Sequence, residues 1–253
     1  MTSSNISLLY PPERPQDARW AQQFSLIGHR GAAKLAPENT LSSFRRAVEL
    51  AVDGVEFDLY AHSGELLVIH DDRLERTTNG QGLLVQKSLE ELRALDAGDG
   101  QQIPLLQEVA ATLPAAVAMN LELKGPDTAA PVAAWLAANR PVQPVLVSSF
   151  DLRELATFRA LDPQCAVAPL FHKRNPAMLD IAHELRACAV NLSTRLASRE
   201  RLQEIRNAGF GALVYTVNGL RQARRLYGDG ATGVFTDRPD RVNRPAVEIS
   251  PRA

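Results

Sequence analysis

The sequence predicts a closed (β/α)₈ barrel. Eight short apolar segments rich in β-branched residues recur along the 253 residues, and most of them are separated by a stretch with helical periodicity. Eight such units in a chain of this length are typical of one barrel. An open doubly wound sheet is the alternative, because periodicity alone does not report whether a sheet closes.

Strands and connecting helices can be placed in order along the chain. After the first strand, Leu41, Phe44 and Val48 fall on one face of a predicted helix, whereas Arg45 and Arg46 fall on the other. Similar amphipathic stretches follow the fourth strand and precede the seventh. The eight strands are expected at Ser25–Arg30, Gly54–Tyr60, Val117–Lys124, Val145–Phe150, Ala166–Phe171, Ala189–Ser193, Ala212–Asn218 and Gly233–Asp237.

One further apolar run, Leu66–His70, does not fit the βα rhythm. Only A-H-S-G-E separates it from the second strand, which is too short for a parallel crossover, so we expect the return arm of a hairpin. Residues 72 to about 105 then form an insertion, in which Ser88 and Glu91 make a capping box for a short helix. The barrel is expected to span residues 24–240 as one domain, with 1–23 and 241–253 loosely attached.

Composition argues against several classes of partner. Lys and Arg number 28 against 29 Asp and Glu, so no basic surface for nucleic acid is expected. No stretch approaches the ~18 apolar residues of a membrane span, and the N-terminus does not resemble a signal peptide. Cys165 and Cys188 have no metal-binding or redox spacing, which is consistent with a reducing compartment. We expect a cytoplasmic protein, and nothing in the sequence indicates its oligomeric state.

Acidic residues share one face of two predicted strands. In G-V-E-F-D-L-Y, Glu56 and Asp58 alternate with apolar residues, and in A-M-N-L-E-L-K, Glu122 and Lys124 do the same. Barrel strands are buried on both sides, so these polar faces should point inward, where unpaired carboxylates are costly. Three such acids fit one hard divalent cation with oxygen ligands. The alternative is a structural ion network with Arg30 and Lys124.

Two histidines close apolar runs that lead toward these acids. His29 ends the first strand and His70 ends the predicted hairpin arm. A histidine pair can act as general acid and base near neutral pH, although a single strand histidine is more often structural. Arg30 and Lys124 would add donors for a phosphate group. Together these groups favour the cleavage of a phosphoester bound by a metal ion.

Several motifs, taken in order, resemble the glycerophosphodiester phosphodiesterase family. The resemblance runs from about Ser25 to Asp240. Within the family, the sequence is most similar in detail to the bacterial cytoplasmic members that work beside glycerol-phosphate uptake systems. The matching stretches are H29-R-G, P37-E-N-T, E56-F-D, H70-D-D-R-L-E-R-T-T-N-G80, N120-L-E-L-K124 and Y215-T-V-N218.

The resemblance implies a role for each candidate residue at the C-terminal mouth of a (β/α)₈ barrel. By resemblance, His29 and His70 are the acid–base pair, and Arg30 and Lys124 grip the phosphate. Glu38 would lie beside His29, as its hydrogen-bond partner or as an outer ligand of the metal. Tyr215 stands where many members have Trp and would contact the glycerol or the alcohol. The family's metal ligands, which hold one Mg²⁺ or Ca²⁺, correspond to Glu56, Asp58 and Glu122.

The implied reaction is hydrolysis of a small-molecule glycerophosphodiester to sn-glycerol 3-phosphate and an alcohol. In one mechanism, a histidine activates the glycerol hydroxyl next to the phosphoester, and water later opens a cyclic phosphate. Direct attack by metal-bound water is the other. The alternatives to a hydrolase are a lyase or phospholipase on the related barrel that yields a cyclic phosphate, and a barrel that binds a phosphorylated ligand without catalysis.

Overall fold

The chain forms a closed parallel barrel. The structure, a computed structural model, describes residue 20, residues 24–243 and residue 247. The first barrel strand pairs with both the second and the last, which closes the sheet, confirms the predicted barrel and excludes the open sheet. The barrel strands are β1 (Ser25–His29), β2 (Gly54–His62), β4 (Ala118–Leu123), β5 (Val145–Ser149), β6 (Ala166–Phe171), β7 (Ala189–Ser193), β8 (Gly211–Tyr215) and β9 (Gly233–Thr236).

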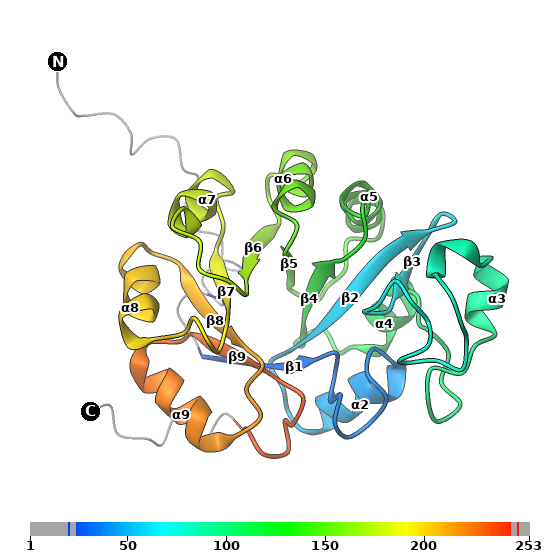
Figure 1. The fold of residues 1–253 in the computed structure, drawn as a ribbon, viewed down its shortest axis with the longest axis horizontal. Coiled ribbons are helices and arrows are strands. Elements are labelled where there is room, and N and C mark those ends of the chain that lie inside the picture. Colours follow the sequence, from blue (N-terminus) through cyan, green and yellow to red (C-terminus); the bar gives the residue numbers. More distant parts are fainter. Residues whose placement is uncertain (1–19, 21–23, 244–246, 248–253) are drawn as a thin grey trace.

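Helices ring the barrel and bury their apolar faces against it (Figure 1). Phe44, Leu155 and Leu202 are fully buried on three of them, as the periodicity predicted. The Thr40 side chain accepts a hydrogen bond from the Ser43 amide and so caps the first of these helices. The helices are α2 (Leu41–Glu49), α4 (Leu106–Thr112), α5 (Ala129–Asn139), α6 (Leu152–Leu161), α7 (Met178–Glu184), α8 (Arg199–Asn207) and α9 (Leu220–Asp229).

The hairpin arm is shorter than predicted. Strand β3 (Glu65–Val68) pairs antiparallel with β2 outside the barrel, which confirms the hairpin. His70 was expected to end this strand but lies two residues beyond it. Most barrel strands also end before the predicted boundary; Lys124, for example, follows the last residue of β4. The physical reason is the same in each case: the final residues of these runs leave the hydrogen-bonded ladder and form the mouth.

The insertion after β3 is a small unit with its own apolar cluster (Figure 1). It contains a 3₁₀ turn, η1 (Leu84–Gln86), and helix α3 (Leu89–Arg93). The predicted capping box is present, since the Glu91 amide donates to Ser88 Oγ over 3.2 Å and the Ser88 amide donates to Glu91 Oε2 over 2.7 Å. The cluster is formed by Leu67, Ile69, Leu74, Leu84, Leu92, Ala97 and Ile103.

Small and aliphatic side chains fill the barrel interior and form an apolar floor beneath the mouth. Trp20 belongs to this cluster, is 1% exposed, and accepts a hydrogen bond at its backbone oxygen from Thr232 Oγ1 over 2.8 Å. The two terminal segments that were predicted to be loosely attached, 1–23 and 241–253, otherwise lie mainly outside the described residues. Among the described residues, no helix combines the length and the apolar character needed to cross a membrane.

Candidate active site

The candidate site is a cavity of about 190 Å³ at the C-terminal ends of the barrel strands. Its two halves differ in chemistry. The ends of β1, β2 and β4, with His70 from the segment after β3, carry the charged groups. The strands on the other side contribute apolar and uncharged polar side chains, among them Leu170, Asn191 and Tyr215. The cavity can therefore hold a ligand with one charged and one uncharged end.

Three buried carboxylates lie together in the charged half. Glu56 and Asp58 alternate on β2, and the β2–β4 register places Asp58 beside Glu122. Their exposures are 3%, 1% and 7%, and one oxygen from each falls within 4.8 Å of the others. Burial, followed by the charges of Asp58 and Glu122, raises the pKa of Glu56 well above its ordinary value, and burial likewise raises that of Glu122. Proximity and burial of this kind are unfavourable unless a cation binds.

The carboxylates also meet two cationic side chains. Arg30 Nε is 3.4 Å from Asp58 Oδ2, and Lys124 Nζ is 3.0 Å from Glu122 Oε1. The structural ion network considered above is thus present, but three carboxylates face two cations, so negative charge remains. Glu56 Oε1 and Asp58 Oδ1 also have no hydrogen-bond partner among the described residues. Oxygen ligands with unused lone pairs and excess negative charge fit a hard divalent cation.

His29 is held by a carboxylate that the sequence did not single out. Its Nδ1 lies 2.7 Å from Asp237 Oδ1, while Nε2 faces the acids, 3.9 Å from Glu56 Oε2. Asn218 fixes Asp237 in turn, because Nδ2 donates to Asp237 Oδ2 over 2.7 Å. Burial acts to raise the pKa of Asp237, but the hydrogen bonds from His29 and Asn218, together with the charges of His29 and Lys34, lower it below its ordinary value. In the sequence, Asp237 and Asn218 could have been noticed only as polar residues that follow β9 and β8.

His70 has an aspartate partner of its own. Its Nδ1 is 2.5 Å from Asp71 Oδ1, and its Nε2 is 3.2 Å from Lys124 Nζ. An ammonium group can only donate, so Nε2 carries the lone pair and Nδ1 carries the proton. Burial lowers the pKa of His70, and the charges of Arg30 and Lys124 act in the same direction, although Asp58 opposes them. The ring is therefore suited to accept a proton in its neutral form.

Glu38 lies at the mouth but does not contact His29, whose partner is Asp237. Glu38 Oε1 accepts from Arg30 Nη1 over 2.7 Å, and both of its oxygens accept from Arg76. Of the two roles expected for Glu38, the hydrogen bond to His29 is not formed, because the loop after β1 turns this carboxylate toward the two guanidinium groups. The role as an outer ligand of the metal stays a prediction. Arg76 belongs to the insertion and was missed as a site residue.

Aromatic rings form the uncharged rim. Tyr215 donates its hydroxyl to the Phe171 carbonyl oxygen over 2.8 Å, so the ring rather than the hydroxyl is offered to a ligand. Phe150 packs edge to face with Tyr215 at 5.8 Å and lies 5.7 Å from Lys124 Nζ. His172 also contacts Phe150, with the ring centroids 5.3 Å apart. The rim gives an apolar wall beside the Lys124 ammonium group.

Comparison with known proteins assigns the family. The model of the glycerophosphoryl diester phosphodiesterase family matches residues 29–241. A glycerophosphodiester phosphodiesterase of Bacillus subtilis is 31% identical over 245 residues, which cover 85% of this chain and 83% of the relative. A phosphodiesterase of Oleispira antarctica, solved in complex with the product sn-glycerol-3-phosphate, is 28% identical with a TM-score of 0.84, covering 91% of this chain and 99% of the other. The chain therefore belongs to the glycerophosphoryl diester phosphodiesterase family and is a hydrolase of phosphoric diesters.

Proposed function

We propose that this hydrolase cleaves glycerophosphodiesters to sn-glycerol 3-phosphate and an alcohol, using one divalent cation and a histidine acid–base pair. The observation that carries the proposal is a cluster of three buried carboxylates beside two histidines, each of which has its own aspartate partner. The product bound to the Oleispira antarctica relative supports the same substrate class.

Glu56, Asp58 and Glu122 would hold the cation. Mg²⁺ and Ca²⁺ both accept such carboxylates, and the size and flexibility of the site decide between them. When bound, the ion neutralises the charge of the phosphate and of the transition state. Arg30 and Lys124 would bind the phosphate oxygens from the same side of the cavity. Both cations lie within 4 Å of the carboxylates that would hold the ion, so they are placed to bind a phosphate recruited to this side of the cavity.

The two histidines would move the protons. His70 Nε2 accepts the proton of the glycerol hydroxyl next to the phosphoester, and that oxygen attacks phosphorus. The alcohol departs with a proton from His29, whose charged form Asp237 stabilises. Water then adds to the cyclic phosphate with the roles of the two histidines exchanged, which releases sn-glycerol 3-phosphate. Direct attack by water, with His70 as its base, is a second route that the same groups serve.

The alternatives use overlapping machinery. A lyase or phospholipase would rely on the same histidines but would stop at the cyclic phosphate or act on intact lipid. The family match and the presence of every acid and histidine argue against a barrel that only binds its ligand. The cytoplasmic location and the absence of nucleic-acid or membrane partners stay predictions.

An assay of product identity separates these reactions. The enzyme would be incubated with glycerophosphocholine, glycerophosphoethanolamine or phosphatidylcholine, and the phosphorus-containing products followed by ³¹P NMR in Mg²⁺, Ca²⁺ or EDTA. We expect sn-glycerol 3-phosphate from the two soluble diesters in one of the cations, and no reaction with the intact lipid. Cyclic phosphate as the final product would support the lyase, and turnover of the lipid would support the phospholipase.

A further inference from the structure

Asn191 is a buried amide that the proposed mechanism does not use. It lies on β7, which is four strands away from β2 in either direction around the barrel, and so faces the acid cluster across the cavity. The residue is 0% exposed and lines the cavity. Neither its Nδ2 nor its Oδ1 has a hydrogen-bond partner within the part of the chain that the structure describes. Buried amides are almost always hydrogen-bonded, so this one points to a polar group of a ligand.

The surroundings of Asn191 restrict the chemistry of that group. Leu170 and Phe235 line the same half of the cavity, and the Tyr215 hydroxyl is already bonded to a backbone carbonyl. Ser148 and Thr216 also line the cavity, and Ser148 Oγ already accepts from Asn120 Nδ2 over 2.6 Å. The Asn191 amide, which has no partner among the described residues, offers one donor side and one acceptor side without charge. A hydroxyl group, which also both donates and accepts, complements it. A phosphate or a quaternary ammonium does not.

We propose that Asn191 binds a free hydroxyl of the substrate's glycerol group and so selects glycerol esters of phosphate. The inference rests on the proposed function, which places the phosphate at the cation and at Arg30 and Lys124. Every glycerophosphodiester keeps two free hydroxyls on its glycerol, whereas the other alcohol varies and, in choline, has no hydroxyl left once esterified. The glycerol is thus the part of the substrate that a fixed amide can recognise in all of them.

A pair of phosphate monoesters tests this without relying on turnover. The dissociation constants of sn-glycerol 3-phosphate and of propyl phosphate, which lacks both hydroxyls, would be measured by calorimetry in the cation that supports activity. The wild-type protein should bind the glycerol ester more tightly. In Asn191→Ala and Asn191→Leu, the ratio of the two constants should shrink by about tenfold, mainly through weaker binding of the glycerol ester.

Two controls keep the result interpretable. Asn191→Leu removes buried polar atoms while keeping the side-chain volume, so its Tm should equal or exceed that of the wild type. Asn139→Ala is the control for Asn191→Ala: it replaces an exposed asparagine at the end of α5 and should leave both dissociation constants unchanged. An unchanged ratio in a folded Asn191 variant would overturn the inference and leave the proposed function intact. Failure of the wild-type protein to bind either ester would overturn the proposed function itself.

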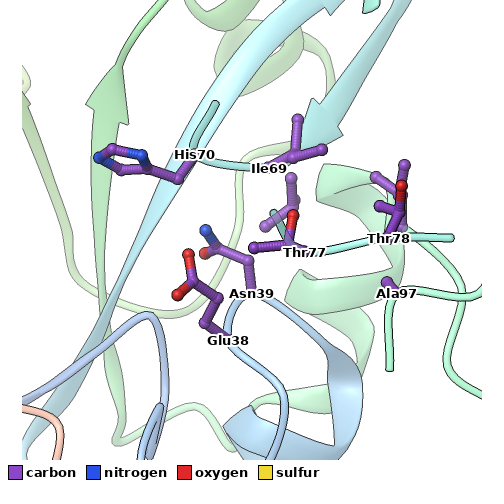
Figure 2. A pocket seen from close by; sticks show the side chains of 9 residues that line it. Glu38, Asn39, Ile69, His70, Thr77, Thr78 and Ala97 are labelled. Carbon is purple, nitrogen blue, oxygen red and sulfur yellow. The ribbon is translucent and has the colours of Figure 1, made fainter. Parts of the chain in front are cut away.

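A separate observation concerns Arg76 and Thr77, which are part of a motif that the proposed mechanism leaves unused. Arg76 Nη1 and Nη2 donate to the two oxygens of Glu38 over 2.9 and 2.8 Å, and Arg76 Nε donates to Asp71 Oδ2. Thr77 and Asn39 line a second cavity, of about 10 Å³, between the insertion and the mouth (Figure 2). Two adjacent residues of the insertion thus lie against two adjacent residues of the loop after β1.

The two residues bonded to Arg76, and Asn39 beside them, each hold a group of the active site. Glu38 accepts from Arg30 Nη1 over 2.7 Å, and Asp71 is bonded to His70 Nδ1 over 2.5 Å. Asn39 Nδ2 donates to Asp58 Oδ2 over 2.8 Å. Arg76 therefore connects the carboxylate that orients the phosphate-binding guanidinium with the carboxylate that orients the histidine. The position of the Arg76 side chain therefore fixes the orientation of both Arg30 and His70.

We infer that Arg76 is a positioning residue, through which the insertion sets the geometry of His70 and Arg30. Arg76→Met keeps the length of the side chain but loses its donors, and it should lower kcat by about tenfold to a hundredfold, because small misplacements of reacting groups cost factors of this size. The side chain of Arg76 is 46% exposed, so Tm should change little. In Arg76→Ala, added ethylguanidinium should restore part of the lost kcat.

Arg73→Met provides a matched control in the same segment. Arg73 is 59% exposed and its ion pair is with Glu75, on the insertion itself, so this change should leave kcat and KM as in the wild type. Wild-type kcat in Arg76→Met would overturn the inference. So would a loss of kcat in Arg76→Ala that follows a loss of Tm and does not respond to ethylguanidinium.

Discussion

Replacing Glu56 by glutamine is expected to lower kcat/KM by about a thousandfold and to abolish the rise in Tm that Mg²⁺ or Ca²⁺ produces. Glutamine keeps the shape and one ligand oxygen but removes one of the three negative charges that would hold the ion. A cation contributes several kcal/mol to the stabilisation of a phosphoryl transition state, and about 1.4 kcal/mol corresponds to a factor of ten in rate.

The same substitution is expected to stabilise the cation-free protein. Burial and two neighbouring carboxylates raise the pKa of Glu56, so its charge opposes folding near neutral pH. In EDTA, the Tm of Glu56→Gln should therefore exceed that of the wild type. Glu65→Gln, the same change on β3, should alter neither Tm nor kcat/KM. A Glu56→Gln enzyme that retains full cation-dependent activity would contradict the assignment of the acid cluster as the metal site.

Replacing His29 by alanine is expected to reduce turnover of glycerophosphocholine by a factor of about 10² to 10⁴, the usual contribution of a general acid or base. The size of the loss should depend on the leaving group. The p-nitrophenyl ester of glycerol 3-phosphate expels p-nitrophenolate, which needs no proton, so this substrate should lose far less activity in His29→Ala. His70→Ala should lose activity on both substrates, because the attacking hydroxyl still needs a base. The measurement is kcat for each enzyme on each ester.

Two further variants define the role of the aspartate behind His29. Asp237→Asn should lower kcat on glycerophosphocholine by a factor approaching that of His29→Ala, since the amide cannot stabilise the charged ring. His62→Gln is the control, because His62 bonds to the Lys87 carbonyl oxygen, away from the cavity. Equal losses on the two esters in His29→Ala would show that His29 is not the acid that protonates the alcohol.

The alternation of side chains along a strand predicted the acidic residues of the site, but local sequence could not predict the residues that hold the histidines in place. Glu56 and Asp58 share a face because side chains alternate along a strand, and that rule needs no tertiary information. The partner of His29 is 208 residues away, at the opposite end of the chain, and becomes its neighbour only because β9 closes the barrel against β1. In the sequence, Asn191 is simply a residue inside a predicted strand. Only the structure shows that its buried amide has no hydrogen-bond partner among the described residues, which makes it a candidate for ligand binding.

The limits of the fold prediction have a similar origin. The helices and strands follow from periodicity, but closure depends on pairing between the first strand, β1, and the last, β9, which no local pattern reports. The hairpin was predicted from a crossover too short to be parallel. The position of His70 beyond the end of β3 was not predicted, because an apolar run does not show where the hydrogen bonds between the strands end. Arg76 was missed for a related reason: its partners Glu38 and Asp71 come from two segments that only the folded insertion brings together.

The most direct test of the central claim is the dependence of turnover on bound cation. EDTA-treated enzyme would be titrated with Mg²⁺ or Ca²⁺ while release of sn-glycerol 3-phosphate from glycerophosphocholine is followed. If Glu56, Asp58 and Glu122 hold the ion that the reaction needs, turnover should be absent at the start and should saturate at one bound cation per chain. Full turnover in EDTA would show that the acid cluster does not bind a required metal and would contradict the mechanism proposed for this site.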